Sequence, residues 1–334
     1  IHKDGANLKC KCPFHNDTHP SLKINVAKQY WRCFVCDKGG DAIEFVKEYK
    51  RCNYIEALEE IAKQYHIDTS DRDVHKAYNA DEKYTKAQKR MMYAAGSMAD
   101  ELSAYLFSGE GENALRYLKE ERGLSEETIK AFRLGYASDD DGLHIKNLRR
   151  EGYNSDDFRN LKMLDTNYKG EEYFAYKGRL MFPIVEEEKG RVVSFAGRIL
   201  PGNEKGRSAK YINGKESDTY KKSDVLYGLF QAKDSIRNEK QAYITEGYCD
   251  VISMHQKGIC NTVASCGTAL TENQIALLKE YVPTVKGMKH VTVMYDSDVA
   301  GMAANLRNGK LLMKACFNVR MVQLPQSKVY GQRN

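Results

Sequence analysis

Two short pairs of Cys and His residues near the start of the chain have the types and spacing of metal ligands. Cys12 and His15 are separated by two residues in "CPFH", and Cys33 and Cys36 are separated by two residues in "CFVC". Zinc takes four nitrogen or sulfur ligands in a tetrahedron, and two knuckles of this kind supply them. The sequence therefore predicts one structural zinc ion. Cys10 and His19 are alternative ligands, but their spacing fits less well.

Carboxylates close two β-rich runs in the last third of the chain. Glu246 ends "YITE", and Asp296 and Asp298 end "VTVMYDSD". Side chains two residues apart on a strand point to the same side, so the two aspartates are expected to lie side by side. Like charges at that distance repel each other unless a cation lies between them.

These carboxylates are expected at one edge of a sheet. The carboxyl ends of parallel strands open onto a common edge, and Asp250 lies one helical turn beyond Glu246. Oxygen ligands in this geometry suit Mg²⁺ or Mn²⁺. The alternative is structural: Asp296 would be a turn residue, and Asp298 would cap the helix that starts near Ala300.

The elements that position these acids alternate along the last third. Strand and helix patterns follow one another, which predicts a mostly parallel sheet with helices on its faces. The strands are expected at residues 241–248, 260–266, 290–298 and 318–325, and the helices at 249–259, 271–282 and 300–316.

Helical and hairpin patterns precede this series. Helical spacing of apolar residues predicts helical structure between residues 41 and 67. Residues 94–131 are also expected to be mainly helical, and Ser125 is placed to cap the helix in "LSEETIKAF". Two β-rich runs joined by a charged turn at Gly190 predict a hairpin in residues 179–200.

The composition is that of an ordinary globular protein: 334 residues, 42% hydrophobic and 29% charged, with 52 Lys+Arg against 46 Asp+Glu. No run is apolar and long enough to cross a membrane, and no signal peptide pattern opens the chain, so we expect a cytoplasmic protein. The cysteines outside the two knuckles are expected to be core thiols: Cys52, Cys249, Cys260, Cys266 and Cys316.

These motifs resemble a known family. "EGYCDVI", "ASCGTALTENQ" and "YDSDVAG" resemble the Toprim domain, a metal-binding fold of nucleotidyl transfer, in the version found in DnaG-type bacterial and phage primases. "CPFHNDTHPSLKI" and "RCFVCDKGGDAIEFV" resemble the zinc domain of that family. "LSEETIKAFRLGYA", "GRLMFPI", "GRVVSFAGRIL", "AKYING" and "KSDVLYGL" resemble its N-terminal polymerase half. The resemblance covers nearly the whole chain in the family's order.

The resemblance implies a DNA primase, a DNA-directed RNA polymerase that makes short RNA primers for replication by metal-dependent nucleotidyl transfer. It implies one structural Zn²⁺ and catalytic Mg²⁺ or Mn²⁺ as cofactors. The implied partners are a single-stranded DNA template, ribonucleoside triphosphates and a replicative helicase, although the helicase-binding domain has no counterpart in this sequence. We expect a monomer that does not associate with membranes.

The functional residues of the family are carried over position by position. The zinc ligands fall on Cys12, His15, Cys33 and Cys36. The catalytic acids fall on Glu246, Asp250, Asp296 and Asp298, and the resemblance implies that Glu246, Asp296 and Asp298 bind magnesium or manganese. The basic residues for template and nucleotide phosphates fall on Arg198, Lys210 and Lys222. Arg179 and Tyr211 lie in the same motifs. Each of the three basic residues could alternatively be an ordinary surface charge.

The expected fold class is α/β (α+β overall), in three structured parts. These are a zinc-ribbon-type domain at residues 1–68 with an incomplete N-terminus, a mixed, basic N-terminal polymerase subdomain at 94–238 and a Toprim parallel α/β sheet at 239–326. A polar linker is expected at 69–93 and a truncated tail at 327–334. The family's last acidic motif, Asp-Pro-Asp, has no counterpart, because no Asp or Glu follows Asp298. We therefore expect a chain that folds and binds zinc and DNA but makes little primer.

Two other classes of function remain open. One is a different Toprim enzyme that cleaves nucleic acid. A type IA topoisomerase needs a further large domain for its tyrosine, and an ATP-dependent nuclease needs a P-loop, which this sequence lacks. The other is a catalytically incomplete fragment that acts only as a zinc-containing, single-stranded DNA-binding module. A primer-synthesis assay separates this module from a primase.

Overall fold

A computed structural model describes residues 1–323 except 6, 28, 37, 51–53, 66, 68–83, 141, 150–152, 203–208 and 266–268. The chain divides into two compact units, Ile1–Tyr84 and Thr85–Asn334. No helix among the described residues is long and apolar enough to cross a membrane.

The first unit is an antiparallel sheet followed by helices α1 (Ala42–Lys50) and α2 (Tyr54–Tyr65), which confirm the helical prediction for this region. The strands pair in sequence order: β1 (His2–Asp4), β2 (Asn7–Cys10), β3 (Leu22–Asn25), β4 (Tyr30–Cys33) and β5 (Gly39–Gly40). Its core is small: Leu22 and Trp31 are buried beside Cys12 and Cys33. A core of this size needs an additional staple such as a metal ion.

The second unit starts with a long helix, α4 (Lys86–Leu106), whose N-terminus is capped by a reciprocal hydrogen-bond pair between Thr85 and Gln88. The helix therefore begins inside the range 69–93 that was expected to be linker, while residues 68–83 lie outside the described part. Shorter turns follow: η1 (Gly109–Gly111), α5 (Glu112–Arg116), the π-turn η2 (Tyr117–Glu121) and α6 (Glu126–Ala131). Ser125 caps α6 as predicted, accepting from the N–H of Thr128.

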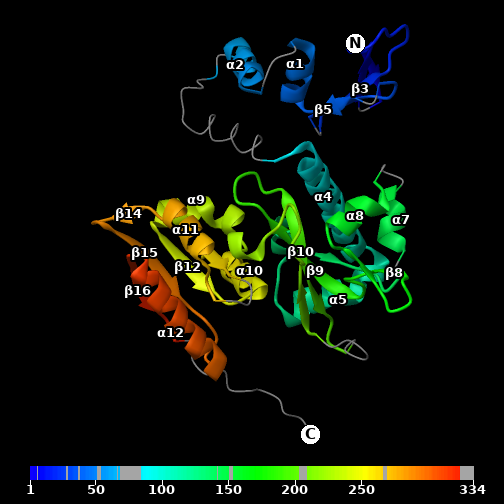
Figure 1. Ribbon diagram of the computed structural model, residues 1–334. Helices are drawn as coiled ribbons and strands as arrows, with labels where there is room; N and C mark the ends of the chain where they lie inside the picture. The colour runs from blue at the N-terminus through cyan, green and yellow to red at the C-terminus, as the bar shows by residue number, and fades with distance from the viewer. Residues whose placement is uncertain are drawn as a thin grey trace. The chain divides into compact units, whose positions relative to one another are not determined.

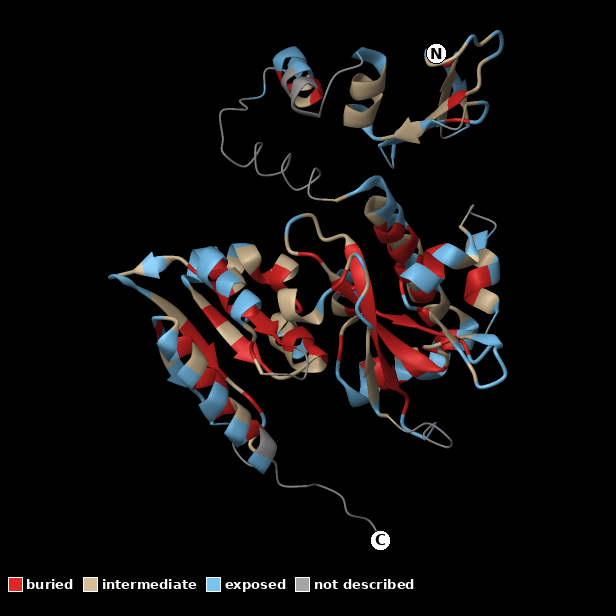
Figure 2. Cartoon of the chain, in the orientation of Figure 1, coloured by how far each residue is buried: buried red, intermediate tan, exposed pale blue. Residues whose placement is uncertain are grey.

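An antiparallel sheet packs against α4. Its order is β11 (Tyr211–Asn213), β10 (Val192–Ile199), β9 (Arg179–Val185) and β6 (Gly135–Tyr136), and the β9–β10 pair confirms the predicted hairpin. Figure 2 shows buried residues concentrated along α4, β9 and β10. The rest of this half comprises α7 (Leu143–Arg149), α8 (Ser155–Asn160), β7 (Leu164–Thr166) and β8 (Glu172–Phe174).

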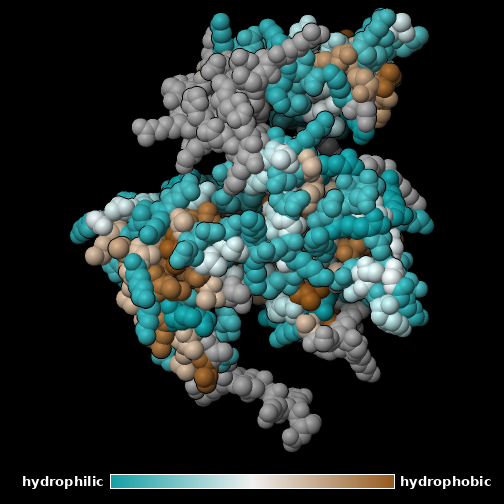
Figure 3. All heavy atoms as spheres, in the orientation of Figure 1, coloured by the Kyte–Doolittle hydropathy of each residue, from teal (hydrophilic) through white to brown (hydrophobic). Residues whose placement is uncertain are grey.

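The last part of the chain forms the predicted parallel sheet (Figure 1). Strands β13 (Thr262–Ala264), β12 (Gln241–Thr245), β15 (Met288–Val293) and β16 (Phe317–Met321) are parallel, and the short β14 (Thr284–Val285) is antiparallel to β15. The helices are η3 (Lys222–Asp224), α9 (Leu229–Glu239), α10 (Tyr248–Gln256), α11 (Glu272–Tyr281) and α12 (Val299–Lys314). Hydrophobic side chains gather on the surface over α12 and β16 (Figure 3).

One strand boundary was predicted wrongly. Strand β15 ends at Val293, so Asp296 and Asp298 lie beyond the strand and alternation along a strand does not place them. The chain turns sharply here, because Gly301 at the start of α12 packs directly on Asp296. A Cβ at Gly301 would lie 2.2 Å from the backbone oxygen of Asp296. The turn, and not the strand, therefore positions the two aspartates.

The two halves of the second unit meet through polar and aromatic contacts. The Tyr248 hydroxyl on α10 donates to Asn213 Oδ1 on β11 at 2.8 Å, and the rings of Tyr248 and Phe182 stack with centroids 5.5 Å apart. Gln256, at the other end of α10, accepts from the Ser125 N–H at 2.6 Å and donates to the Gly123 oxygen at 2.7 Å. The Tyr248 contacts hold helix α10 against the antiparallel sheet, and the Gln256 contacts hold it against the segment before α6.

Candidate nucleotidyl-transfer site and zinc centre

The structure brings Cys12, His15, Cys33 and Cys36 together, with their ligand atoms all within 4.8 Å of one another. The Cys12 and Cys36 sulfurs are 3.8 Å apart, and Cys33 Sγ is 3.8 Å from Nδ1 of His15. A tetrahedral zinc ion with Zn–S bonds of about 2.3 Å places two sulfurs about 3.8 Å apart. This group therefore fits zinc. Neither alternative ligand, Cys10 or His19, belongs to it.

Asp17 organises the loop that carries the first knuckle. One carboxylate oxygen accepts from the Cys12 N–H at 2.7 Å and from the Ser21 hydroxyl at 2.5 Å, and these bonds lower the pKa of Asp17 to about 2. The other oxygen is 3.6 Å from Nε2 of His15. A carboxylate behind a metal-binding histidine orients its ring and raises its basicity. Asp17 is thus a supporting residue of the zinc centre.

The thiol of Cys33 is prepared for metal binding. Burial raises its pKa, but N–H groups of Cys36 and Val35 and the Ser21 hydroxyl bring that pKa down to about 6. Burial raises the pKa of the neighbouring Cys12 thiol to about 12. A metal ion offsets that cost when it binds the thiolates.

Four carboxylates gather where the parallel strands end, and we call this group the acidic edge: Glu246, Asp250, Asp296 and Asp298. Strands β12 and β15 are in parallel register, with Ile244 opposite Val293, so their carboxyl ends coincide. Asp296 and Asp298 are exposed, whereas Glu246 is half-buried.

The acidic edge is electrostatically strained. Burial raises the pKa of Glu246, and the negative charges of the three neighbouring aspartates raise it further. Burial also raises the pKa of Asp250, although a hydrogen bond from the Gly247 N–H at 2.9 Å and the charge of Arg122 act in the opposite direction. A bound cation would relieve this repulsion, and all the available donors are oxygens, as Mg²⁺ requires.

The acidic edge is more open than the zinc centre. In the described part of the chain, the carboxylates do not form a metal-binding group as tight as the Cys/His cluster. Asp298 also caps α12, since its Oδ1 accepts from the Gly301 N–H at 2.7 Å. The capping role proposed as an alternative is therefore real, and one carboxylate oxygen of Asp298 is engaged in it.

An aromatic and basic group lies beside the acidic edge, and we call it the arginine cluster: Tyr117, Arg122, Arg198, Tyr211 and Cys249. Arg198 on β10 is only 5% exposed, and its guanidinium lies over the rings of Tyr117 and Tyr211, at 5.1 and 5.6 Å from their centroids. Its Nε and Nη1 atoms are buried and have no hydrogen-bond partner. Donors in this state point to an anionic ligand.

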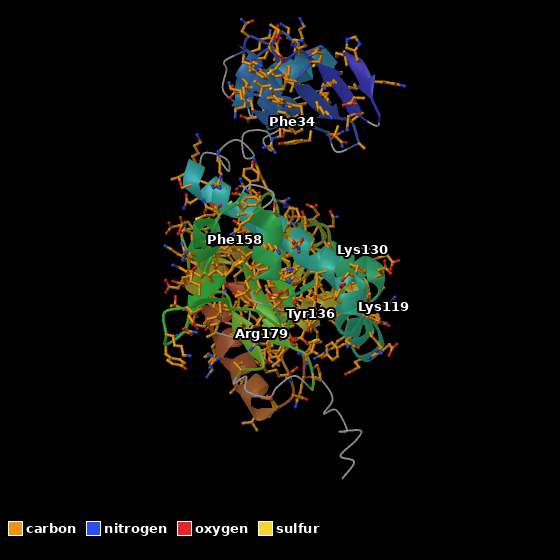
Figure 4. The ribbon with its side chains drawn as sticks, turned by 90° about the vertical axis from the view of Figure 1, so that its right-hand side faces the viewer. Phe34, Lys119, Lys130, Tyr136, Phe158 and Arg179 are labelled. Carbon is orange, nitrogen blue, oxygen red and sulfur yellow. The ribbon has the colours of Figure 1, made fainter. Side chains whose placement is uncertain are left out.

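The other basic residues predicted from the sequence lie outside the arginine cluster: Lys210, Lys222 and Arg179. Lys210 is exposed and precedes β11, and Lys222 is partly exposed in η3. Arg179 pairs with Ile199, the residue after Arg198, so its side chain lies on the opposite face of the sheet. Its Nη1 donates to the backbone oxygen of Lys210 at 3.3 Å, and the side chain is 6% exposed. Arg179 is labelled in Figure 4. The structure therefore does not bring Arg179 together with the arginine cluster.

Sequence reasoning missed two members of the arginine cluster. Arg122 donates through Nε to the Tyr117 hydroxyl at 2.7 Å, and its charge influences Asp250. Arg122 and Tyr117 lie in residues 94–131, where the sequence predicted helices but no functional residue. The available signal was the neighbouring motif, because Arg122 lies two residues before the "LSEETIKAFRLGYA" stretch that resembles the polymerase half.

The structure buries none of the three described cysteines that were expected to be core thiols: Cys249, Cys260 and Cys316. Cys316 is exposed, because it lies in the turn between α12 and β16 with a φ of 66°, and it is not a core thiol. Cys249 and Cys260 are partly exposed, and Cys249 Sγ is 3.6 Å from the Tyr211 hydroxyl, within the arginine cluster. Cys52 and Cys266 lie outside the described residues.

Comparison with known families assigns each part of the chain. Residues 1–77 match the CHC2 zinc finger, residues 102–233 match the N-terminal domain of the DNA primase catalytic core, and residues 243–329 match the Toprim-like family. The Cys/His cluster of a CHC2 zinc finger fits one Zn²⁺, and Toprim domains are associated with Mg²⁺, so both predicted cofactors are confirmed. The assignment of individual ligands stays a prediction.

Individual proteins give the same result. A DNA primase of Clostridium acetobutylicum is 35% identical over 332 residues, 98% of this chain and 52% of that protein. The crystal structure of the Aquifex aeolicus primase, with its zinc-binding and RNA polymerase domains, has a TM-score of 0.65 and 32% identity over 98% of this chain and 74% of that one. A DnaG primase catalytic domain bound to single-stranded DNA has a TM-score of 0.62 and 30% identity over 72% of this chain and 73% of that one.

The chain spans about half the length of the curated relatives that it matches. Its zinc centre, its antiparallel basic sheet and its parallel acidic sheet follow one another in the order of the matched families. The predicted resemblance and fold class are confirmed, and the chain belongs to the family of DnaG-type DNA primases.

Proposed function

We propose that this chain acts as a DNA primase, a DNA-directed RNA polymerase that joins ribonucleoside triphosphates into short primers on single-stranded DNA. One observation carries the proposal: the acidic edge lies beside the arginine cluster in one unit. Arg122 is close enough to Asp250 for its charge to lower the pKa of that carboxyl group. Nucleotidyl transfer needs this combination, because carboxylates hold the metal ions while cations hold the phosphates.

The residues of the site have separate roles in this proposal. Glu246, Asp296 and Asp298 would hold Mg²⁺ or Mn²⁺, and Asp250 would support them from the first turn of α10. When bound there, the metal supplies positive charge to the attacking 3′-hydroxyl and to the leaving pyrophosphate. The arginine cluster orients the phosphates, since Arg198 presents unpaired N–H donors from a buried position. Lys210 and Lys222 would extend this contact along the nucleic acid backbone.

We further propose that the sheet of the first unit contacts the template strand. His2, Lys9, Lys23 and Arg32 form a directly opposed row across strands β1 to β4. Lys9, Lys23 and Arg32 in this row carry like charges that face each other across strands, an arrangement that is destabilising by itself, and Asp4 pairs with Lys23 at 2.8 Å. A row of this kind favours an anionic partner.

Phe34 adds an aromatic surface to the same face. It is 67% exposed (labelled in Figure 4), and the Lys23 ammonium lies 5.9 Å from its ring centroid. Exposed rings among basic side chains are the usual platform for unstacked bases. Single-stranded DNA is therefore the nucleic acid that this surface suits.

The monomers, the helicase partner and the cellular location are part of the same proposal. We propose that ribonucleoside triphosphates are the monomers and that a replicative helicase works with the protein in replication. We also propose that the protein works in the cytoplasm, where the bacterial template is found. The DnaG primase catalytic domain whose structure is bound to single-stranded DNA supports the template as a partner.

Primer synthesis tests the proposal directly. The chain is incubated with a single-stranded oligonucleotide, Mg²⁺ or Mn²⁺ and labelled ribonucleoside triphosphates, and the products are separated by length. As the sequence predicts, we expect short RNA products only in small amounts, and we expect Asp296→Asn to abolish them without loss of zinc. DNA binding without any product would contradict the enzymatic proposal and leave a zinc-containing DNA-binding module.

A further inference from the structure

Tyr117 contacts both arginines of the arginine cluster. Its hydroxyl accepts a hydrogen bond from Arg122 Nε at 2.7 Å. Its ring lies near both guanidinium groups, with centroid distances of 5.1 Å to Arg198 and 5.5 Å to Arg122. The side chain is 7% exposed, so its position is fixed by the surrounding core. One neutral residue therefore holds two cations close together.

The π-turn η2 makes this double contact possible. Residues five apart in an α-helix are about 140° apart around the axis, so their side chains do not meet. Here the Arg122 N–H donates to the Tyr117 oxygen at 3.1 Å, the five-residue bond of a π-turn, and the wider turn brings the two side chains to one side. Isolated π-turns inside helices occur frequently at functional sites.

Aromatic faces leave the arginine donors available. A guanidinium held by carboxylates or carbonyls has its N–H groups occupied, whereas one held over rings keeps them unpaired. Arg198 lies over Tyr117 and Tyr211, and its Nε and Nη1 are buried without a partner. Burying unpaired donors costs free energy, and a phosphate with several acceptor oxygens would recover it.

We infer that Tyr117 is a positioning residue, which sets Arg122 and Arg198 side by side to clamp one phosphate group. The inference rests on the proposed function and goes further, because it names the residue that arranges the phosphate contacts. The phosphate can belong to the DNA strand or to an incoming nucleoside triphosphate. Tyr117 itself stays buried behind the arginines and makes no contact with the ligand.

The test compares Tyr117→Phe, which keeps the ring, with Tyr117→Leu, which removes it. Tyr281 provides a matched control: it is 6% exposed and carries the Arg237 guanidinium 5.3 Å from its ring, outside both the acidic edge and the arginine cluster. Tyr281→Phe and Tyr281→Leu report the cost of the same changes where no phosphate binds. Binding of a labelled single-stranded oligonucleotide and of labelled ATP with Mg²⁺ is measured for each full chain.

We expect Tyr117→Phe to weaken the binding of one of the two probes about tenfold, as loss of a charge-assisted hydrogen bond would. Tyr117→Leu should weaken the same probe about thirtyfold, because both arginines lose their support. The probe whose binding weakens shows whether the phosphate belongs to the DNA strand or to the nucleoside triphosphate. Both Tyr281 variants should bind both probes like the unsubstituted chain.

Salt dependence separates positioning from packing. Tyrosine is uncharged, so a packing role would leave the slope of log affinity against log salt concentration unchanged. Loss of one or two arginine contacts should lower the slope for a single strand by about 0.7 or 1.4. If Arg198→Ala weakens binding but both Tyr117 variants keep the parent affinity and slope, the inference is wrong and the proposed function stands. If the unsubstituted chain binds neither probe, both are wrong.

Discussion

At the scale of single residues, the charge of Glu246 is unfavourable for the folded chain in the absence of metal. Its pKa is raised above the ordinary value of 4.5 by burial and by neighbouring carboxylates. The stability that this residue contributes is fully present below the unfolded pKa and is lost as the pH rises through the folded pKa. The site thus gives up stability at neutral pH, which a bound cation would restore.

Glu246→Gln should therefore stabilise the chain in buffer without added magnesium or manganese. The gain in melting temperature over the unsubstituted chain should grow as the pH rises from the ordinary pKa of 4.5 through the raised pKa of the folded chain. The apparent affinity for Mn²⁺, measured from the stabilisation that it gives, should fall about tenfold. Thermal melts across this range with and without Mn²⁺ provide the measurement. Glu239→Gln, an exposed change just before β12, is the control. A gain that does not depend on pH would contradict the electrostatic explanation.

The basic residues give a second prediction at this scale. Replacing Arg198, Lys210 and Lys222 together by alanine should lower the salt slope of single-stranded DNA binding by about 0.7 for each phosphate contact that is lost. The matched control replaces three exposed lysines near the amino ends of the parallel strands: Lys240, Lys257 and Lys279. Fluorescence anisotropy of a labelled single-stranded oligonucleotide at several salt concentrations gives the salt slope of each triple variant. Equal slopes for the two triple variants would mean that the first three are ordinary surface charges.

At the scale of elements, the turn between β15 and α12 depends on a single glycine. Gly301→Ala would place a Cβ 2.2 Å from the Asp296 oxygen and 3.0 Å from its nitrogen, so the turn has to move. We expect a lower melting temperature and weaker Mn²⁺ binding, because Asp296 and the cap at Asp298 shift together. The loss should exceed about 1 kcal/mol, the scale of other strained backbone positions.

Gly96→Ala is the control for that change. Gly96 lies within α4, and a Cβ there meets no atom within 4 Å. Alanine is favoured over glycine inside helices, so this variant should gain about 0.5–1 kcal/mol of stability and bind Mn²⁺ normally. Similar effects of the two substitutions on Mn²⁺ binding would show that the close approach at Gly301 does not position the acids.

At the scale of the whole molecule, zinc should stabilise the first unit alone. Trp31 is the only tryptophan in the sequence, and it packs against Phe14 and Phe45 beside the buried Cys33. Removing zinc with a chelator should change the fluorescence of Trp31 as this small core opens. The melting transition of residues 85–334, which have their own cores, should stay within about 1 °C.

Two measurements check this prediction. Cys33→Ser with Cys36→Ser should show the fluorescence of the chelated protein and bind less than one equivalent of zinc. If the double variant retains a full equivalent, the assigned ligands are wrong. If the chelator also destabilises residues 85–334, the two units do not fold independently.

The sequence by itself determined the features that depend on short-range patterns. Cys12, His15, Cys33 and Cys36 sit in pairs whose two-residue spacing suits a knuckle. The cap at Ser125 and the β9–β10 hairpin follow from local sequence patterns. Local signals suffice in these cases because each structure is specified by residues close together in the chain.

Tertiary structure decided what depends on residues distant in sequence. The exact end of β15 is set by the approach of Gly301 to Asp296, which periodicity does not encode. The opposite faces of Arg179 and Arg198 follow from strand register, and Arg122 joins the site through a π-turn and the packing of Tyr117 under Arg198. Burial, charge coupling and unpaired donors arise only when separate elements meet, and so the chemistry of the arginine cluster became visible only in the folded chain.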